Sequence, residues 1–309
     1  MKQRVLGKCG PKVPIICFGA WPIGGGMGSV DVNQSVATVH AAIDSGMTFI
    51  DTAEGYQTSE SVLGKALSER RHEVVLATKL SGNDHSETHM RNAIENSLTA
   101  LGTDYIDLYQ LHSPQSRWPM EETMGGLLRL KEEGKIRYIG ISNYSPGQTE
   151  DAMSHGPVQS SQPRYNMIFR HDEERTLKFC HDNDIGVIPH SVLAKGLLGG
   201  RYKPGDTFPE DDERRLFNFF RGKLFEQIFD VTTRLDEWAH DRGRDIVQLA
   251  VAWVIAHPAV TSAIVGMKNP QQVSQVSMAA EWELSTSELE EIELIIGDLQ
   301  PTWTKDAFS

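Results

Sequence analysis

Residues 73–112, EVVLATKLSGNDHSETHMRNAIENSLTALGTDYIDLYQLH, hold a complete strand–helix–strand pattern. The stretch begins and ends with short runs of strand-forming residues. Between these runs, Ile94, Leu98 and Leu101 recur at the spacing of one helical face, and Gly102 stands where a helix of that length ends. A strand, a helix and a second strand in this order are the repeat of a parallel α/β sheet.

The same pattern recurs from one end of the chain to the other. Gly46 and Gly134 mark two more helix ends. The strands follow one another roughly every 30 residues, which is the size of one βα unit. Their short continuous runs are typical of parallel strands buried on both faces. The eight predicted strands are Ile15–Phe18, Thr48–Ile50, Glu73–Thr78, Tyr105–Leu111, Ile136–Ile141, Val158–Gln162, Ile185–Ile188 and Thr261–Val265.

Eight such units favour a closed (β/α)8 TIM barrel over an open doubly wound sheet. An open nucleotide-binding sheet would carry G-x-G-x-x-G after its first strand, and this sequence does not. Gln3–Leu6 and Lys12–Pro14 predict an N-terminal β-hairpin that plugs the barrel floor. We expect residues 1–309 to form one barrel domain. The segment Arg201–Arg221 follows strand 7 and predicts a long loop, either a solvated insertion or a functional element.

Composition argues against several classes of protein. The chain has 42 acidic and 30 basic residues and a net charge of -12, which repels nucleic acid. No apolar run approaches the roughly 18 residues that cross a bilayer, and the N-terminus has no signal-peptide pattern, so we expect a cytoplasmic protein without a membrane partner. Cys9, Cys17 and Cys180 form no C-x-x-C pair, and we expect them to be small buried apolar groups.

Polar and ionisable residues follow nearly every predicted strand. Because the carboxyl ends of barrel strands meet at one rim, these side chains would converge there. Taken singly, each has an ordinary explanation, such as a loop cap for Asp51 or a satisfied core histidine for His112. Burying a lysine and a carboxylate unpaired would be costly, so the set indicates a site. In chain order it comprises Asp51, Tyr56, Lys79, His112, Ser142, Asn143, Gln162, His190, Ser191, Gly266 and Lys268.

Four of these residues suit proton exchange with an oxygen bound to carbon. A tyrosine has a pKa of about 10, which is too high for easy proton exchange at neutral pH. Lys79 beside Tyr56 would favour the phenolate and lower that pKa, and Asp51 would keep the lysine charged. His112 would hydrogen-bond the substrate oxygen. The set supplies no electrons, so a redox reaction would need a cofactor.

At these residues the sequence resembles the aldo-keto reductase superfamily over essentially its whole length. A long loop containing LLGGRY (197–202) is similar to that of the bacterial branch of general-stress and polyol or sugar reductases. The resemblance implies a barrel that binds NADPH without a Rossmann fold. The motifs that carry it are FIDTAEGY (49–56), ATK (77–79), DYIDLYQLH (104–112), IGISNY (139–144) and QPRYN (162–166).

The resemblance also implies a role for each site residue. Asp51, Tyr56, Lys79 and His112 would form a catalytic tetrad with Tyr56 as general acid and base. The remaining positions would bind NADPH, with no metal. Ser142, Asn143 and Gln162 would hold the nicotinamide carboxamide; His190 would lie against the nicotinamide; the backbone around Ser191, Leu193 and Gly196 would carry the pyrophosphate; Gly266, Lys268 and Gln272 would hold the adenosine and its 2′-phosphate; and Trp21 is placed at the cofactor site as well.

Two positions depart from the family's pattern. His190 stands where relatives usually have a larger aromatic residue stacked on the nicotinamide. A histidine offers less stacking area and can titrate near pH 6.5, so we expect weaker or pH-dependent cofactor binding. Val276 stands where many relatives carry Asn or Glu against the adenine, which weakens the expected adenine contact.

The leading hypothesis is an NADPH-dependent carbonyl reductase or alcohol dehydrogenase acting on a small aldehyde, ketone or sugar. The alternative is a slow-turnover, NADPH-binding regulatory protein similar to channel β-subunits. A metal-dependent barrel hydrolase is disfavoured because a lysine stands among the few histidines and carboxylates of the rim. Trp21, Trp118 and the loop Phe217–Phe220 are either a wall for the substrate or part of the core. The physiological substrate, the reaction direction and the oligomeric state stay open.

Overall fold

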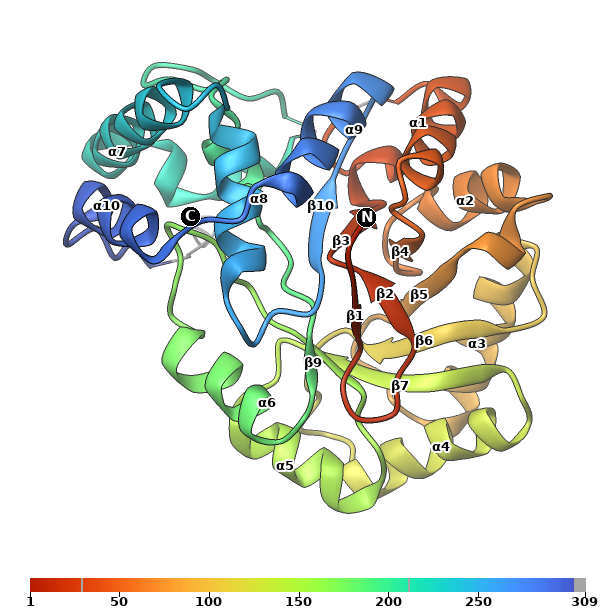
Figure 1. Ribbon diagram of the computed structural model, residues 1–309. Helices are drawn as coiled ribbons and strands as arrows, with labels where there is room; N and C mark the ends of the chain where they lie inside the picture. The colour runs from red at the N-terminus through yellow and green to blue at the C-terminus, as the bar shows by residue number, and fades with distance from the viewer. Residues whose placement is uncertain (29, 211, 303–309) are drawn as a thin grey trace.

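Eight short parallel strands form one sheet at the centre of the molecule (Figure 1). The computed structural model describes residues 1–28, 30–210 and 212–302. Every strand lies where the sequence predicts it, with ends that shift by one or two residues. The strands are β3 (Ile16–Gly19), β4 (Phe49–Asp51), β5 (Val75–Leu80), β6 (Ile106–Leu111), β7 (Ile136–Ser142), β8 (Ser160–Gln162), β9 (Gly186–Val187) and β10 (Ala263–Gly266).

The sheet closes on itself as a barrel. Strands β3 to β9 pair in chain order, and β10 pairs with β3. Between β9 and β10, the Thr261 N–H donates to Val187 O at 2.7 Å and the Ile264 N–H donates to Pro189 O at 3.0 Å. Gly140 in β7 shows how tightly the barrel is packed, because a Cβ there would lie 2.4 Å from Ser160 Oγ. The predicted (β/α)8 architecture is confirmed.

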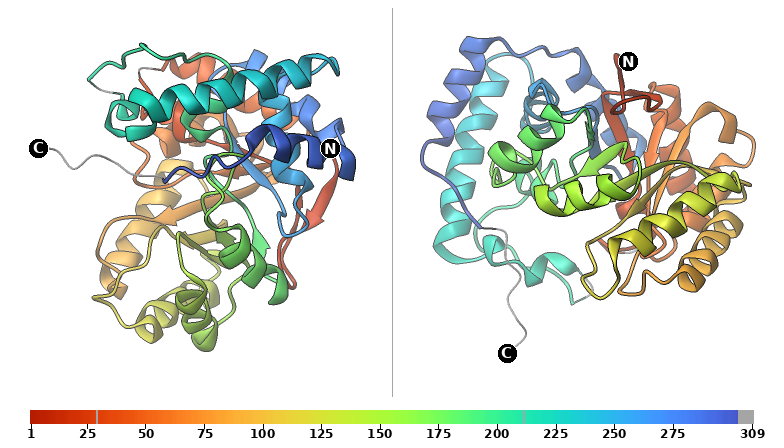
Figure 2. Two further views of the ribbon diagram at one scale, coloured as in Figure 1. Left: turned by 90° about the vertical axis from the view of Figure 1, so that its left-hand side faces the viewer. Right: turned by 90° about the horizontal axis from the view of Figure 1, so that it is seen from below.

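Helices surround the barrel, as the two views of Figure 2 show. In α3, the Ser86 hydroxyl caps the N-terminus by accepting the His89 N–H, and Gly102 ends the helix at a φ of 63°. The helix α7 lies between β9 and α8 in the chain, in addition to the helix that follows each barrel strand, and it packs against α10 (Figure 1). The helices are α1 (Val32–Asp44), α2 (Ser59–Leu67), α3 (Glu87–Leu101), α4 (Met120–Glu132), α5 (Pro146–His155), α6 (Lys178–Asp182), α7 (Gly222–His240), α8 (Ile246–Ala256), α9 (Pro270–Ser277) and α10 (Thr286–Ile296).

The N-terminal hairpin covers the floor of the barrel, as predicted. Its strands are β1 (Gln3–Val5) and β2 (Lys12–Pro14), which pair antiparallel. The Lys8 N–H donates to Asp184 O at 2.8 Å, just before β9 begins. Leu6 and Val13 are fully buried, in one cluster with residues of the barrel strands. The hairpin therefore fills the end of the barrel that lies opposite the strand carboxyl ends.

The expectation that all three cysteines are buried is wrong for Cys9. It lies in the turn of the hairpin, is exposed and has a φ of 66°, whereas Cys17 and Cys180 are buried. Tight turns project their side chains into solvent, so residue type alone does not decide burial there.

The predicted long loop runs from β9 toward α7; residues 201–210 are mostly exposed, whereas the second half of the loop packs against the protein. Phe217, Phe219 and Phe220 are buried, and two short 3₁₀ helices, η5 (Glu213–Leu216) and η6 (Asn218–Phe220), organise the segment. Asp211, part of its acidic run, lies outside the described residues. Within the described ranges, no helix combines the length and the apolar composition that crossing a bilayer requires.

Candidate active site

A cavity of about 930 Å³ opens at the carboxyl ends of the barrel strands. Its walls come from the ends of β4, β7, β8 and β10, from the long segment after β9 and from α9. Lys79 is buried beneath the cavity, where it touches Tyr56. Of the residues that the sequence assigns to the site, those lining the cavity are Trp21, Asp51, Tyr56, His112, Ser142, Asn143, Gln162, His190, Ser191, Leu193, Gly196, Gly266, Lys268 and Gln272.

Lys79 connects Asp51 to Tyr56. Its Nζ lies 2.5 Å from Asp51 Oδ2, 2.9 Å from the main-chain oxygen of Thr52 and 3.3 Å from the phenol oxygen of Tyr56. The three protons of the ammonium group therefore have three acceptors. Burial alone would lower the pKa of Lys79, but Asp51 and Tyr56 outweigh burial and hold the pKa above its usual value. The ammonium stays charged inside the protein.

The second carboxylate oxygen of Asp51 is held by two amides. Gln110 and Gln162 donate to Oδ1 through their side-chain nitrogens at 2.9 Å and 3.0 Å. Gln162 also donates to the side-chain oxygen of Gln110 at 3.0 Å. Gln110, which sequence reasoning passed over, points inward from β6 and is completely buried. Both carboxylate oxygens of Asp51 therefore accept hydrogen bonds from buried side chains, although Asp51 does not face water.

The pKa of Tyr56 departs from the expected direction. Burial raises the pKa of Tyr56 above its usual value, although Lys79 acts to lower it; Asp51 and Glu213 add to the rise. The expected effect of Lys79 is present, but desolvation of the phenolate is larger. The phenol therefore keeps its proton at neutral pH.

His112 lines the cavity beside Tyr56, with the two ring centroids 5.6 Å apart in an edge contact. Its Nδ1 lies 2.8 Å from the hydroxyl oxygen of Ser81. Burial, and then the neighbouring Lys79 cation, lower the pKa of His112 to about 4. The imidazole is therefore neutral at pH 7, and it acts as a hydrogen-bond donor through one ring nitrogen only.

Asn143 links several of the predicted cofactor residues. It has a φ of 63°, and its side-chain nitrogen donates to the main-chain oxygen of His112 at 3.0 Å and to Ser142 Oγ at 3.1 Å. Its side-chain oxygen lies 3.1 Å from Nε2 of His190. Ser142 in turn donates to the main-chain oxygen of Gln162 at 3.0 Å. The three predicted carboxamide ligands thus lie side by side across the ends of β7 and β8.

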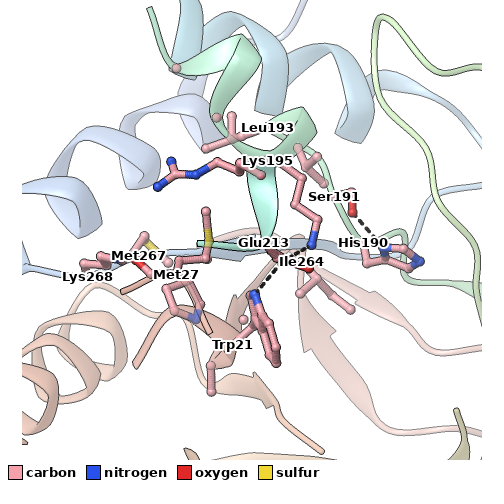
Figure 3. A pocket seen from close by; sticks show the side chains of 18 of the residues that line it. Trp21, Met27, His190, Ser191, Leu193, Lys195, Glu213, Ile264, Met267 and Lys268 are labelled. Atoms are coloured by element: carbon pink, nitrogen blue, oxygen red, sulfur yellow. Dashed lines mark hydrogen bonds and ion pairs between the residues drawn. The ribbon is translucent and has the colours of Figure 1, made fainter. Parts of the chain in front are cut away.

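His190 is held at both ring nitrogens, because its Nδ1 lies 2.8 Å from Ser191 Oγ (Figure 3). Burial, followed by the nearby Arg164 cation, lowers the pKa of His190 well below its usual range. The expected titration near pH 6.5 is therefore wrong for this residue, because desolvation disfavours the imidazolium. The other expectation for His190, that its smaller stacking area weakens cofactor binding, stays a prediction.

The backbone after His190 takes an unusual path. Ser191, Ala194, Lys195 and Gly196 have φ values of 59°, 47°, 58° and 100°. A Cβ at position 196 would lie 2.9 Å from the Tyr202 ring, so glycine is needed there for space as well as for conformation. Left-handed conformations at non-glycine residues cost on the order of 1 kcal/mol or more each and cluster at functional sites. Successive N–H groups in such turns form concavities that bind anions.

The opposite end of the cavity carries several cations. Lys268 donates to the main-chain oxygen of Met27, and the Lys268 N–H donates to Gln272 Oε1 at 2.7 Å. Burial, and then the Arg214 cation, lower the pKa of Lys268 below its usual value, with Asp212 opposing them. Val276 lines this end and is buried, so an apolar side chain occupies the position where many relatives carry Asn or Glu.

Sequence reasoning placed the long loop near the site but missed the charged residues that it contributes. Glu213 accepts the indole N–H of Trp21 at 3.1 Å and forms an ion pair with Lys195 (Figure 3). Arg214 is buried against Asp212, with its Nε 2.8 Å from Oδ1. Asp212, Glu213 and Arg214 lie 21 to 23 positions after Ser191, the last polar residue assigned to the end of the seventh strand, so the strand-end rule gave no signal for them.

The aromatic residues considered for a substrate wall divide into three groups. Trp21 and Phe217 line the cavity, and the Trp21 ring lies 4.8 Å from that of Tyr56 in an edge contact. Phe219 and Phe220 are core residues. The Trp118 indole N–H donates to Asn83 O at 3.2 Å, and its side chain lines a different hollow beside Glu122.

The fold and the site together define a class of protein: a closed (β/α)8 barrel that carries a tyrosine, a lysine, an aspartate and a histidine at its mouth. The chain belongs to the Aldo/keto reductase family, whose sequence pattern matches residues 15–296. This is a family of oxidoreductases.

Individual relatives cover nearly the whole chain. The Bacillus subtilis aldo-keto reductase YhdN is 36% identical over 310 residues, with 96% of this chain and 94% of that protein covered. The Schizosaccharomyces pombe aldo-keto reductase yakc, whose name specifies NADP(+), is 32% identical, with 91% and 87% covered. The structure of the glycerol dehydrogenase AKR11B4 from Gluconobacter oxydans superposes with a TM-score of 0.88 at 31% identity, covering 99% of this chain and 98% of that one.

Proposed function

We propose that this chain is an NADPH-dependent reductase that interconverts an aldehyde, ketone or sugar carbonyl and the corresponding alcohol, with Tyr56 as general acid and base. The observation that carries the proposal is the chain of contacts from Asp51 through Lys79 to Tyr56. Of these three groups, Tyr56 would exchange a proton with a ligand in the cavity, and Lys79 would stay charged beside it. His112 stands beside it as a second donor.

The lining of the cavity suits an extended dinucleotide. Its volume of about 930 Å³ lies at the upper end of the range for ligand sites. Ser142, Asn143 and Gln162 would hold the carboxamide, and the left-handed turns after His190 would receive the pyrophosphate. This agrees with the family to which the chain belongs.

The cations at the far end favour NADPH over NADH. Lys268, Arg214 and Arg201 all line the cavity, and the pKa of Lys268 is lowered first by burial and then by repulsion from the two arginines. Cations held this close to one another suit a site that receives an anion, and the 2′-phosphate supplies one that NADH lacks. The relative yakc, named for NADP(+), supports the same choice.

In reduction, the Tyr56 phenol would donate its proton to the carbonyl oxygen. Lys79, 3.3 Å away, would stabilise the phenolate that remains, and Asp51 would keep Lys79 charged. Neutral His112 would donate a hydrogen bond to the same oxygen as negative charge develops on it. When bound, the nicotinamide supplies the hydride that the side chains cannot.

The substrate end of the cavity combines apolar and polar surface. Trp21 and Phe217 offer aromatic faces, and the Glu213–Lys195 pair lies over Trp21. A small hydroxylated carbonyl compound would use both kinds of surface. The likeness to a glycerol dehydrogenase supports this substrate class.

Two measurements test the proposal. Purified protein is titrated with NADPH and with NADH by intrinsic fluorescence, and NADPH oxidation is then followed with a panel of aldehydes, ketones and sugars. Tyr56→Phe should bind NADPH as the wild type does and lose most of its turnover, because it lacks only the hydroxyl. We expect a loss of at least roughly 100-fold, the lower range of general acid catalysis.

The outcomes separate the hypotheses. Steady turnover that depends on Tyr56 supports an enzyme. Tight NADPH binding with no appreciable turnover across the panel supports the alternative of a regulatory protein. A Tyr56→Phe variant as active as the wild type contradicts the assignment of the acid.

A further inference from the structure

Ser81 follows β5 directly, two residues after Lys79, and lies beside the end of β6. The pairing of β5 with β6 sets Leu80 opposite Leu111, and the His112 N–H donates to Leu80 O at 3.1 Å. This register brings the next two side chains together, with Ser81 Oγ 2.8 Å from Nδ1 of His112. The contact is thus a consequence of strand pairing.

Ser81 is itself held in place from the other side. Its main-chain N–H donates to Oε1 of Glu54 at 2.6 Å. A Cβ at Gly55 would lie 3.1 Å from Ser81 Oγ and 3.2 Å from its Cβ, so the two loops touch closely at the glycine. Glu54 and Gly55 immediately precede Tyr56, so one loop presents the phenol and holds the serine.

The serine contact decides where the proton of His112 sits. Burial and Lys79 keep the imidazole neutral, so only one of its nitrogens carries hydrogen. The Ser81 hydroxyl could either donate to Nδ1 or accept from it. Donation is favoured because, among the contacts of the described residues, Nδ1 is the acceptor within reach of the hydroxyl hydrogen. With Nδ1 accepting, the hydrogen of the ring lies on Nε2. A carbonyl oxygen is an acceptor only, and it requires such an N–H.

We infer that Ser81 is a positioning residue that holds His112 in the Nε2–H form, with Nε2 left for the oxygen of the substrate. The inference deepens the proposed function and rests on it for the identity of that oxygen. Ser81 is not among the residues that line the cavity. Ser81 acts by fixing the tautomer and the orientation of the His112 ring. Without Ser81, the ring could rotate, or it could present an unprotonated nitrogen to the carbonyl oxygen.

The tautomer can be measured without activity. Nitrogen-15 NMR of the full chain at pH 7 without cofactor reports which ring nitrogen of each histidine is protonated, and the signals lost in His112→Gln identify His112. We expect Nε2–H alone in the wild type and a mixture of tautomers in Ser81→Ala. Ser81→Thr retains a hydroxyl and should restore the wild-type pattern. Ser113→Ala is the matched control, because that hydroxyl donates to the main-chain oxygen of His112 rather than to its ring.

Kinetics provide the second readout. Ser81→Ala should lower kcat/KM for aldehyde reduction about fivefold, which corresponds to about 1 kcal/mol, and should leave the Kd for NADPH unchanged. Ser81→Thr should recover most of the loss.

A wild type protonated on Nδ1, or a Ser81→Ala variant with the tautomer of the wild type, overturns the inference. A wild type without any NADPH-dependent turnover contradicts the proposed function instead, and the NMR result then still decides whether Ser81 sets the tautomer.

Discussion

The Nζ atom of Lys79 lies 2.5 Å from Oδ2 of Asp51, and their side chains are only 0% and 3% exposed. Desolvating two charges is expensive, and their attraction recovers the cost only while both are present. The pair is therefore sensitive to the loss of either partner, and it holds the cation that contacts Tyr56.

Removing the lysine alone should destabilise the fold strongly. Lys79→Met leaves the Asp51 carboxylate buried without its cation, and we expect the free energy of unfolding to fall by about 3–5 kcal/mol. The double variant with Asp51→Asn should be more stable than Lys79→Met, because no uncompensated charge remains. Urea denaturation followed by circular dichroism measures both.

The exposed pair of Lys178 and Asp182 provides the control. Its side chains are 62% and 50% exposed, so Lys178→Met should change the free energy of unfolding by less than about 1 kcal/mol. Equal losses for Lys178→Met and Lys79→Met would show that burial of the Lys79–Asp51 pair has no energetic consequence.

The two directions of the reaction should respond oppositely to pH. Because the pKa of Tyr56 lies above its usual value, the phenol is protonated at neutral pH and is ready to donate. The rate of carbonyl reduction should stay level through neutral pH and decline only above about pH 10. Alcohol oxidation needs the phenolate, so its rate should rise steadily with pH. Initial rates in each direction from pH 6 to 10.5, with cofactor affinity measured in parallel, check this. An oxidation rate that is flat between pH 7 and 10 would falsify the assignment.

Lys268 should discriminate between the two nicotinamide cofactors. Losing one charge-assisted contact to a phosphate costs roughly 1.5–3 kcal/mol, so Lys268→Gln should weaken NADPH binding by about 10- to 100-fold. NADH, which lacks the 2′-phosphate, should bind as it does to the wild type. Fluorescence titration measures both. Lys203→Gln is the matched control, since Lys203 is an exposed lysine of the long loop after β9 and is absent from the cavity wall. Equal weakening of NADPH and NADH would argue against a phosphate contact.

A larger ring at position 190 should strengthen cofactor binding. His190→Tyr adds stacking area worth roughly 1 kcal/mol, so we expect about fivefold tighter NADPH binding. Since burial keeps the pKa of His190 well below its usual range, affinity in the wild type should not vary between pH 5 and 8 through this residue. His72→Tyr, on the exposed turn before β5, is the control. A His190→Tyr variant that binds no more tightly would show that the contact with Asn143 matters more than area.

Much of the candidate site could be predicted from the positions where strands end. Asp51, Lys79, His112 and Gln162 lie within one residue of the ends of β4, β5, β6 and β8, so local sequence alone places them on one rim. The same reasoning could not find Glu213 or Arg214, because the path of their loop depends on burying Phe217, Phe219 and Phe220 against the core. Nor could it find Ser81 as the partner of His112, since this contact depends on the exact register between β5 and β6.

The amino-acid sequence by itself determined the barrel, its hairpin floor and the kinds of group at its mouth, because hydrophobic periodicity and strand order are local properties that parallel pairing turns into a ring. Only the tertiary structure decided whether burial or neighbouring charges dominate the pKa values of those groups. Lys79 acts on Tyr56 in the expected direction, yet the loss of water around the phenol outweighs it, and the same loss keeps His190 neutral. Desolvation depends on how completely distant segments cover a side chain, and that is a property of packing in three dimensions.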